Sequence, residues 1–317
     1  MKAYTLSSPD GPDGLKLSDL DVPRPGPGEV LIGVRAISIN PVDFKTGRGK
    51  ALYGSLQDDQ PLILGWDVAG TVKEVGEGVD RFEAGQRVFG MVNFPGHGKA
   101  YAQYVTAPAA HLAEIPAGID FDAAAAATLA ALTAWQNLYE LADIQSGQRV
   151  LIHAAGGGVG HFAVQLARER GAHVIGTASA SKQAFLRELG VDEAVDYEKE
   201  KFEDVLEPVD VVLESLSPDH LLRSIQLVKP GGKLLSIAAG LSDQLQERAE
   251  FKSVELHHHL VQSNGQQMQA IAERLADGRL VPHVSKTFAF ANLPEALREV
   301  EGGSTRGKVV VLVEAQS

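Results

Sequence analysis

The chain has 317 residues and no cysteine, and its 29 Lys and Arg against 41 Asp and Glu give a formal net charge of −12 at pH 7. This acidic balance disfavours nucleic acid and anionic membranes as partners, and the lack of cysteine excludes disulfides and cysteine-ligated metals. The length predicts one large or two moderate domains. The first residues lack the apolar segment of a signal peptide, and no apolar run is long enough to span a bilayer, which favours a cytoplasmic location.

β-strand patterns dominate the first third of the sequence. Residues 29–35, 67–75 and 86–92 are rich in apolar and β-branched residues, and turn-forming stretches separate them. We expect a small, irregular β-rich domain over residues 1–121. Residues 262–317 are expected to return to it and to end in a closing strand.

The pattern changes at residue 120, where an alanine-rich helix is predicted to begin. From Arg149 onward, predicted strands and helices alternate, which is typical of a parallel sheet with helices on both faces. We therefore expect an α/β protein whose second domain, residues 122–261, is a doubly wound parallel sheet. The predicted strands of this domain are residues 149–154, 172–177, 209–213, 232–237 and 251–256.

A glycine-rich turn follows the first of these strands. The apolar run 149–154 leads into Ala155-Gly-Gly-Gly-Val-Gly160, and an apolar pattern at helical spacing comes next. Strand, glycine turn and helix in this order form a dinucleotide-binding motif, because backbone N–H groups and the helix N-terminus approach a pyrophosphate there. We expect Gly157, Gly158, Val159 and Gly160 to border the cofactor. The alternative is a glycine-rich turn that binds nothing.

The end of the second strand points to the kind of dinucleotide. A site that prefers NAD usually has Asp or Glu here, to bond the ribose 2′-hydroxyl. This chain has Ser179, Ser181 and Lys182 instead, two hydroxyls and a cation that suit a 2′-phosphate. The residues therefore predict NADPH rather than NADH. The alternative is that Lys182 is an ordinary solvated lysine.

Together these features resemble a medium-chain dehydrogenase/reductase of the zinc-independent quinone oxidoreductase type. The resemblance is carried by Asn40-Pro-Val-Asp43-Phe-Lys45, Leu64-Gly-Trp-Asp67-Val-Ala-Gly70, Leu129-Ala-Ala-Leu-Thr133-Ala-Trp135, His153 to Gln165, and Thr305-Arg-Gly-Lys308. It implies a GroES-like catalytic domain, a Rossmann-type cofactor domain and a homodimer. It also implies that Thr133 faces the nicotinamide and that Lys182 and Tyr197 contact the 2′-phosphate. With the strand before Tyr197 counted as the third, Leu216, Ile237 and Ala238 end the fourth and fifth strands, where the cofactor edge is expected.

The chain departs from the zinc-dependent members that the family also contains. Residues 40–43 and Trp66-Asp67 stand where the resemblance places their zinc ligands, and catalytic zinc needs three ligands of N, S or O type. We therefore expect no metal. Without zinc to stabilise an alkoxide, alcohol oxidation is disfavoured.

The resemblance implies hydride transfer from NADPH to a small-molecule quinone or to the C=C of an α,β-unsaturated carbonyl. Both acceptors develop negative charge on oxygen, which hydrogen-bond donors stabilise. The candidate donors are Asn40, Lys45 and Tyr53. As alternatives, Asn40 only stabilises its turn, Lys45 pairs with Asp67, and Tyr53 is a surface aromatic. Two other functions stay open: an enoyl-thioester reductase, and a non-enzymatic NADPH-binding sensor.

Overall fold

A computed structural model describes residues 1–238 and 240–314. It contains two compact units: unit 1 comprises Met1–Leu132 and Val261–Ser317, and unit 2 comprises Thr133–Leu260. The alanine-rich helix α3 (Phe121–Ala126) lies in unit 1, because it packs on the unit 1 strands β3, β4 and β15. The change between the units therefore falls after Leu132 and not at residue 121.

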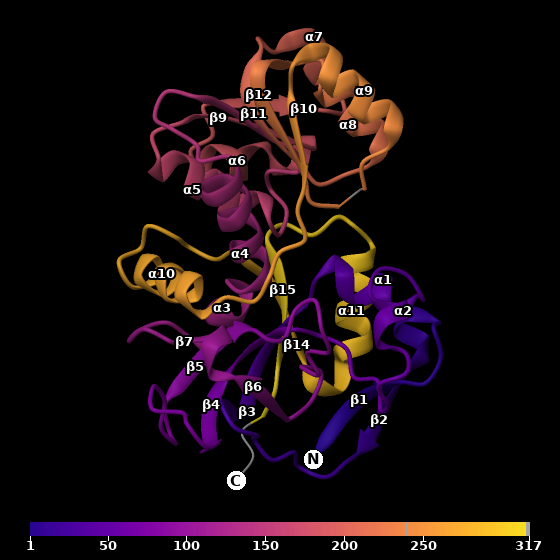
Figure 1. Ribbon diagram of the computed structural model, residues 1–317, viewed down its shortest axis with the longest axis vertical. Helices are drawn as coiled ribbons and strands as arrows, with labels where there is room; N and C mark the ends of the chain where they lie inside the picture. Colours follow the sequence, from indigo (N-terminus) through magenta and orange to yellow (C-terminus); the bar gives the residue numbers. More distant parts are fainter. Residues whose placement is uncertain (239, 315–317) are drawn as a thin grey trace. The chain divides into compact units, whose positions relative to one another are not determined.

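Unit 1 is built around a seven-stranded sheet of order β14-β15-β3-β4-β5-β7, with β6 paired to β3 (Figure 1). Neighbouring strands are antiparallel except β14 and β15. A separate antiparallel pair joins β1 to β2. The strands are β1 (Lys2–Leu6), β2 (Leu15–Asp19), β3 (Glu29–Ser38), β4 (Asp67–Val75), β5 (Arg87–Met91), β6 (Tyr104–Pro108), β7 (Leu112–Glu114), β14 (Val284–Ala289) and β15 (Lys308–Leu312).

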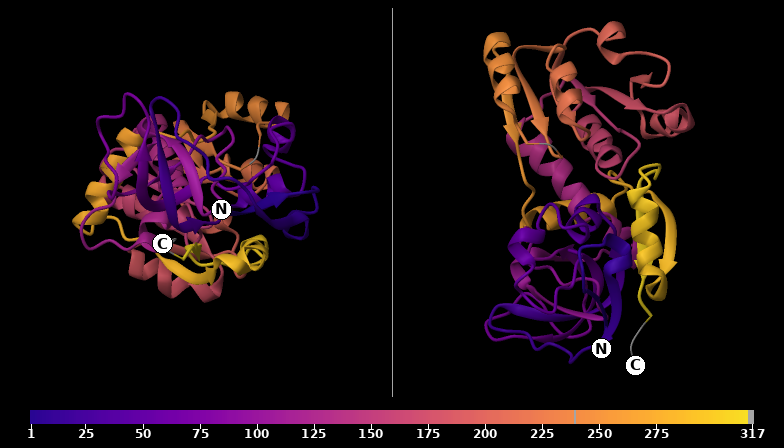
Figure 2. Two further views of the ribbon diagram at one scale, coloured as in Figure 1. Left: turned by 90° about the horizontal axis from the view of Figure 1, so that it is seen from below. Right: turned by 90° about the vertical axis from the view of Figure 1, so that its right-hand side faces the viewer.

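The helices of unit 1 cover this sheet and its loops. The helix α10 (Gly265–Ala276) packs on β7, and α11 (Leu293–Glu301) lies along β14 and β15, as the yellow segments of Figure 2 show. Two short helices, α1 (Pro41–Gly47) and α2 (Tyr53–Leu56), follow β3. The helix α4 (Leu129–Trp135) continues from α3 across the boundary into unit 2, where a π-helical turn, Gln136–Leu141, extends it.

Unit 2 contains a six-stranded sheet of order β10-β9-β8-β11-β12-β13 in which every pair is parallel. Its central strands are continuous apolar runs: Val150, Leu151 and Ile152 of β8 are all 0% exposed. Such runs are typical of parallel strands, which are buried on both faces. The strands are β8 (Arg149–Ile152), β9 (His173–Ala178), β10 (Glu193–Asp196), β11 (Val209–Glu214), β12 (Val228–Ser236) and β13 (Glu255–His258).

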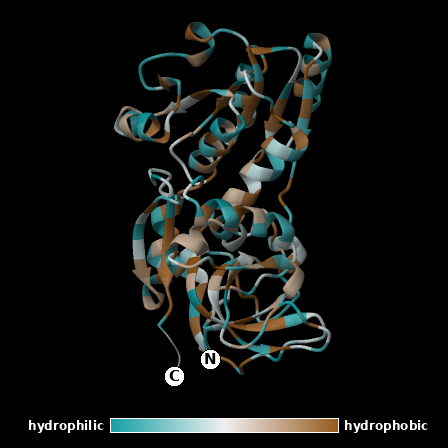
Figure 3. Cartoon of the chain, turned by 90° about the vertical axis from the view of Figure 1, so that its left-hand side faces the viewer, coloured by the Kyte–Doolittle hydropathy of each residue, from teal (hydrophilic) through white to brown (hydrophobic). Residues whose placement is uncertain are grey.

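Helices cover both faces of the unit 2 sheet (Figure 1), and the strands between them carry much of the hydrophobic colour in Figure 3. On one side, α5 packs on β8 and β9, and α6 packs on β9 and β10. On the other, α8 packs on β11 and β12, and α9 packs on β13. These helices are α5 (Gly160–Glu169), α6 (Gln183–Leu189), α8 (Pro218–Ser224) and α9 (Asp243–Lys252), and a short α7 (Phe202–Val205) precedes β11.

The expected α/β fold, a β-rich domain joined to a doubly wound parallel sheet, is confirmed. One predicted strand is wrong over part of its length: Phe251 and Lys252 end α9, and β13 begins only at Glu255. The buried Leu245 and Ala249, four residues apart, hold α9 on the sheet, while the Phe251 side chain is 86% exposed. In the described part of the chain, no helix is long and apolar enough to cross a membrane.

Candidate active site

The carboxyl ends of the parallel strands in unit 2 form a single edge of the sheet. The chain starts at β8 in the middle, proceeds outward to β10, and returns to β11 on the other side of β8. Ligands of such sheets bind outside the carboxyl ends at this switch point. Most of the predicted cofactor residues follow strands at this edge: Gly157, Gly158, Val159 and Gly160 after β8, Ser179, Ser181 and Lys182 after β9, Tyr197 after β10, Leu216 after β11, and Ile237 and Ala238 after β12.

The turn after β8 has the shape that a pyrophosphate needs. Ala154 has a φ of +49°, which turns the chain sharply, and its carbonyl accepts a hydrogen bond of 2.8 Å from the Gly157 N–H. A Cβ atom at Gly160 would lie 2.3 Å from the Ala154 carbonyl oxygen. Only glycine therefore fits at the start of α5. The turn places the half-buried residues Gly157, Gly158 and Val159 at the N-terminus of α5, a position that fits a dinucleotide phosphate.

Ser179, Ser181, Lys182 and Tyr197 are brought together at the ends of β9 and β10. The two serine hydroxyls lie 3.1 Å apart, and the Tyr197 N–H donates to the Ala178 carbonyl at 3.4 Å. The Lys182 stem covers the glycine turn, since a Cβ atom at Gly156 would lie 3.2 Å from Lys182 Cδ. The Tyr197 side chain is 54% exposed. The Lys182 stem thus lies beside the turn, and two serine hydroxyls precede it at the end of β9, a set of groups that suits a phosphate.

The remaining predicted cofactor residues lie in different surroundings. Thr133 is 5% exposed on α4, and its carbonyl accepts from the Asn137 side chain at 2.8 Å. Leu216 is 46% exposed after β11 and donates its N–H to Glu214 Oε1 at 2.7 Å. Ile237 donates its N–H to the Glu214 carbonyl at 3.0 Å, and Ala238 follows it with an exposed side chain.

Asn40 lies in a buried polar group of unit 1 that we name the acid-rich cluster. Asn40 Nδ2 donates to Asp67 at 2.7 Å, and Asn40 Oδ1 accepts from Lys308 Nζ at 2.5 Å. Asp43 caps the Asn40 backbone N–H at 2.8 Å and accepts from the Tyr101 hydroxyl at 2.8 Å. All five side chains are at most 3% exposed. The Asn40 amide is therefore committed to neighbours within the protein.

Burial dominates the electrostatics of the acid-rich cluster. It raises the pKa of Asp43 to about 7, and the nearby Asp67 carboxylate adds to the rise against the hydrogen bonds that Asp43 accepts. Burial also raises the pKa of Asp67 and lowers that of Lys308, although their charges, 4.0 Å apart, oppose both shifts. Two carboxyl groups thus share one ammonium group away from water.

Lys45 and Tyr53 lie outside this cluster. Lys45 is exposed on α1, and Tyr53 is half-buried at the start of α2. The alternative that Lys45 pairs with Asp67 is wrong, because Asp67 is buried and the cation beside it is Lys308. Asp43 and Asp67 hold the turn and not the Lys45 side chain.

Zinc does not fit this part of unit 1. The side chains where zinc ligands are expected, Asn40, Asp43 and Asp67, are hydrogen-bonded to one another, to Tyr101 and to Lys308. The Lys308 ammonium already supplies a positive charge there, and a zinc ion beside it would be repelled. Trp66 offers no ligand atom, since its indole N–H donates to the Gly96 carbonyl.

Unit 2 contains a second buried polar group, which we name the imidazole cluster. His220 Nδ1 lies 2.5 Å and Ser224 Oγ 3.1 Å from Glu214 Oε2, and Ser224 Oγ lies 3.0 Å from His153 Nε2. His153, Glu214 and His220 have the spacing of metal ligands, but these hydrogen bonds already use the atoms that would bind a metal. Burial lowers the pKa of His153 to about 3, so its ring is neutral at pH 7.

Sequence reasoning assigned no role to Lys308, Tyr101 or Glu198. Lys308 carried a local signal, since it is the single charged residue in the run Lys308-Val-Val-Val-Leu. A lysine inside a buried strand needs a partner, and two buried carboxyl groups provide it. Glu198 follows Tyr197 directly, and its side chain accepts a hydrogen bond from the Ala180 N–H at the end of β9.

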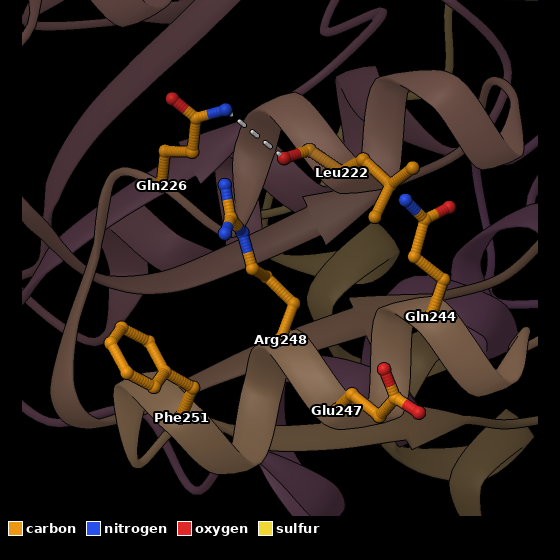
Figure 4. Close-up of a pocket in the computed structure, with 6 residues that line it drawn as sticks. All are labelled: Leu222, Gln226, Gln244, Glu247, Arg248 and Phe251. Carbon is orange, nitrogen blue, oxygen red and sulfur yellow. Dashed lines mark hydrogen bonds between the residues drawn. The ribbon is translucent and has the colours of Figure 1, made fainter.

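An open groove of about 500 Å³ lies on the outer surfaces of α8 and α9 in unit 2. Figure 4 shows its six lining side chains, among which Phe251 is 86% exposed and Gln226 donates to the Leu222 carbonyl. None of the lining residues belongs to the carboxyl ends of the strands. We assign no function to this groove.

Comparisons with known proteins agree with this architecture. Residues 26–117 match the family described as alcohol dehydrogenase GroES-like domain, and residues 189–311 match zinc-binding dehydrogenase. The chain is 32% identical over 325 residues to 2-methylene-furan-3-one reductase of Solanum lycopersicum, covering 98% of this chain and 79% of that protein. It is 32% identical over 321 residues to the chloroplastic NADPH-dependent alkenal/one oxidoreductase of Arabidopsis thaliana, with the same coverage of 98% and 79%. The structure of the quinone oxidoreductase from Coxiella burnetii superposes with a TM-score of 0.94 at 34% identity, covering 99% of each chain.

Proposed function

Since the chain belongs to the medium-chain dehydrogenase/reductase superfamily and is an oxidoreductase, we propose that it is a zinc-independent, NADPH-dependent reductase of quinones or α,β-unsaturated carbonyl compounds. The observation that carries the proposal is the carboxyl edge of the unit 2 sheet. There the glycine turn after β8 lies beside the stem of Lys182, which follows the Ser179 and Ser181 hydroxyls at the end of β9.

NADPH, when bound, supplies a hydride from its nicotinamide ring. The turn at Gly157, Gly158, Val159 and Gly160 is proposed to hold the pyrophosphate through backbone N–H groups other than that of Gly157, which donates to the Ala154 carbonyl. Lys182 and the hydroxyls of Ser179, Ser181 and Tyr197 are proposed to bind the 2′-phosphate, which they favour by charge and hydrogen bonding. Thr133, Leu216, Ile237 and Ala238 are proposed to border the remainder of the cofactor.

The acceptor gains negative charge on oxygen as the hydride arrives, and the chain must stabilise that charge. The Asn40 amide is bonded to Asp67 and Lys308, so we propose that Asn40 positions the turn and does not contact the acceptor. Lys45 and Tyr53 are the proposed donors, because Lys45 is exposed on α1, Tyr53 is half-buried at the start of α2, and both helices follow the Asn40 turn along the chain. Either side chain can also deliver the proton that completes the reduction.

The test is NADPH oxidation with a 1,4-quinone and with a short 2-alkenal, each measured with and without EDTA. We expect turnover that EDTA leaves unchanged. We also expect Lys182→Ala to raise the KM for NADPH by about tenfold, because a charge-assisted bond to the phosphate is lost. The control is Lys16→Ala, which removes an exposed lysine of unit 1 and should leave KM unchanged.

Other outcomes favour the alternatives. Turnover only with crotonyl-CoA would favour an enoyl-thioester reductase. Tight NADPH binding without turnover of any acceptor would favour a sensor. Loss of turnover in EDTA would overturn the proposal of a zinc-independent reaction.

We also propose that the protein forms a homodimer. Within the described residues, β13 ends the sheet of unit 2 and pairs only with β12, so its other edge is open to a strand from a second copy. Light scattering after size-exclusion chromatography tests this, and a mass of one chain would overturn it.

A further inference from the structure

The predicted 2′-phosphate site contains an acid. Glu198 follows Tyr197 after β10, and its Oε2 accepts a hydrogen bond of 3.2 Å from the Ala180 backbone N–H. The Glu198 backbone is itself fixed, because its N–H donates to Asp196 Oδ1 at 3.1 Å. Asp196 is 9% exposed, so this attachment lies at the protected end of β10.

The position of this hydrogen bond matters more than its strength. Ala180 lies between Ser179 and Ser181, whose hydroxyls are 3.1 Å apart. Lys182 follows, and its stem covers Gly156 of the glycine turn. The Glu198 carboxylate therefore lies among the groups that suit a phosphate, and it occupies a backbone donor that a phosphate oxygen would otherwise use.

The two nicotinamide cofactors respond to this carboxylate in opposite ways. A 2′-phosphate carries negative charge, so the Glu198 carboxylate repels it and competes with it for the Ala180 N–H. A 2′-hydroxyl can donate a hydrogen bond to the carboxylate, as the ribose of NAD does to Asp or Glu in dinucleotide-binding folds. The Glu198 carboxylate thus weakens the binding of NADPH and strengthens the binding of NADH.

We propose that Glu198 sets the cofactor specificity of this site by lowering its preference for NADPH and allowing NADH to bind. The inference rests on the proposed function, since it takes the end of β9 as the ribose site. It differs from the prediction from sequence, which found no acid at the end of the second strand. Glu198 instead follows β10, the third strand of unit 2, and the parallel pairing of β10 with β9 brings the ends of the two strands together.

Glu198→Gln tests the proposal, because it removes the charge and keeps nearly the same shape. We expect kcat/KM for NADPH to rise by about tenfold and kcat/KM for NADH to fall, both with the same acceptor. The matched control is Glu200→Gln, which removes an exposed acid two residues away and should change the ratio of the two values less than about twofold.

Binding measured without turnover separates this inference from the proposed function. Dissociation constants for both cofactors come from nicotinamide fluorescence, whether or not an acceptor is known. If the wild-type protein binds both cofactors but reduces neither acceptor, the proposed reaction fails while the Glu198 test still stands. If Glu198→Gln has the same NADPH to NADH affinity ratio as the wild type and as Glu200→Gln, the role of Glu198 is overturned.

Discussion

The two units each bury a polar group, but the two groups are opposite in composition. In unit 1 the acid-rich cluster has two carboxyl groups, Asp43 and Asp67, for one ammonium group, Lys308. In unit 2 the imidazole cluster has one carboxylate, Glu214, for the two rings of His153 and His220. Burial penalises charge in both clusters, and the side chain with the fewest opposite charges and hydrogen bonds to stabilise its ionised form favours its neutral form.

This difference teaches that the two units should respond to pH in opposite directions. Burial raises the pKa of Asp43 to about 7, so unit 1 loses stability as the pH rises and that acid must ionise. Burial lowers the pKa of His153 to about 3. Unit 2 therefore loses stability as the pH falls, because His153 is protonated in the unfolded chain before it is protonated in the folded chain. Glu214 acts in the same direction as His153. Burial raises the pKa of Glu214, but the His220 hydrogen bond and the nearby imidazole rings lower it by more, so the net shift is downward.

The two tryptophans make the comparison measurable. Trp66 lies in unit 1 and Trp135 in unit 2. Fluorescence of a Trp135→Phe background therefore follows unit 1, and fluorescence of a Trp66→Phe background follows unit 2.

The largest expected effect comes from removing the cation of unit 1. Lys308→Met leaves the 0% exposed Asp67 without its ammonium partner and should lower the free energy of unfolding of unit 1 by about 3–5 kcal/mol. Urea unfolding in the Trp135→Phe background measures it. The matched control is Lys286→Met, which breaks the exposed pair with Glu299 and should cost less than about 1 kcal/mol. Equal losses in the two variants would contradict a buried ion pair.

Much of the fold, and which residues meet at the carboxyl ends of the unit 2 strands, could be predicted from the sequence, because the signals are local. Residues 67–75 carry the apolar alternation of β4, and the glycine turn is recognisable from the six residues 155–160 alone. Once the sheet is known to be parallel, residues after successive strands meet at one edge, as Ser179 and Tyr197 do. The parallel pairing of β9 and β10 is enough to bring these two residues to the same edge, whatever the exact register of the two strands.

The acid-rich cluster and Glu198 could not be predicted in this way. Lys308 lies 268 positions from Asn40 along the chain, and only the antiparallel pairing of β15 with β3 brings them together. Glu198 contacts Ala180 through a loop whose conformation follows from the capping hydrogen bond to Asp196, which no sequence period encodes. Contacts of this kind depend on tertiary packing and not on local pattern.

A smaller effect is expected from the imidazole cluster. In the Trp66→Phe background, unit 2 should lose on the order of 2 kcal/mol between pH 6.5 and pH 4, because the His153 pKa is depressed in the folded state. His153→Gln removes the ionisable ring and should flatten this part of the curve. His173→Gln, a change at a ring that is 38% exposed in the same unit, should leave it as steep as in the parent. Parallel curves for His153→Gln and its parent would show that another group causes the loss.

The smallest expected effect tests whether unit 1 has the opposite sign. The folded pKa of Asp43, about 7, lies above its unfolded value near 4, so its contribution is complete below about pH 4 and is lost as the pH rises through 7. In the Trp135→Phe background, unit 1 should lose about 1 kcal/mol between pH 6 and pH 7.5, because the unfolded acid is ionised throughout this range whereas the folded acid ionises only near pH 7. Asp43→Asn should remove this slope, whereas Asp58→Asn, at an exposed acid of the same unit, should retain it. If unit 1 instead gains stability over this range, Asp43 is ionised in the folded protein and Lys308 compensates both carboxylates.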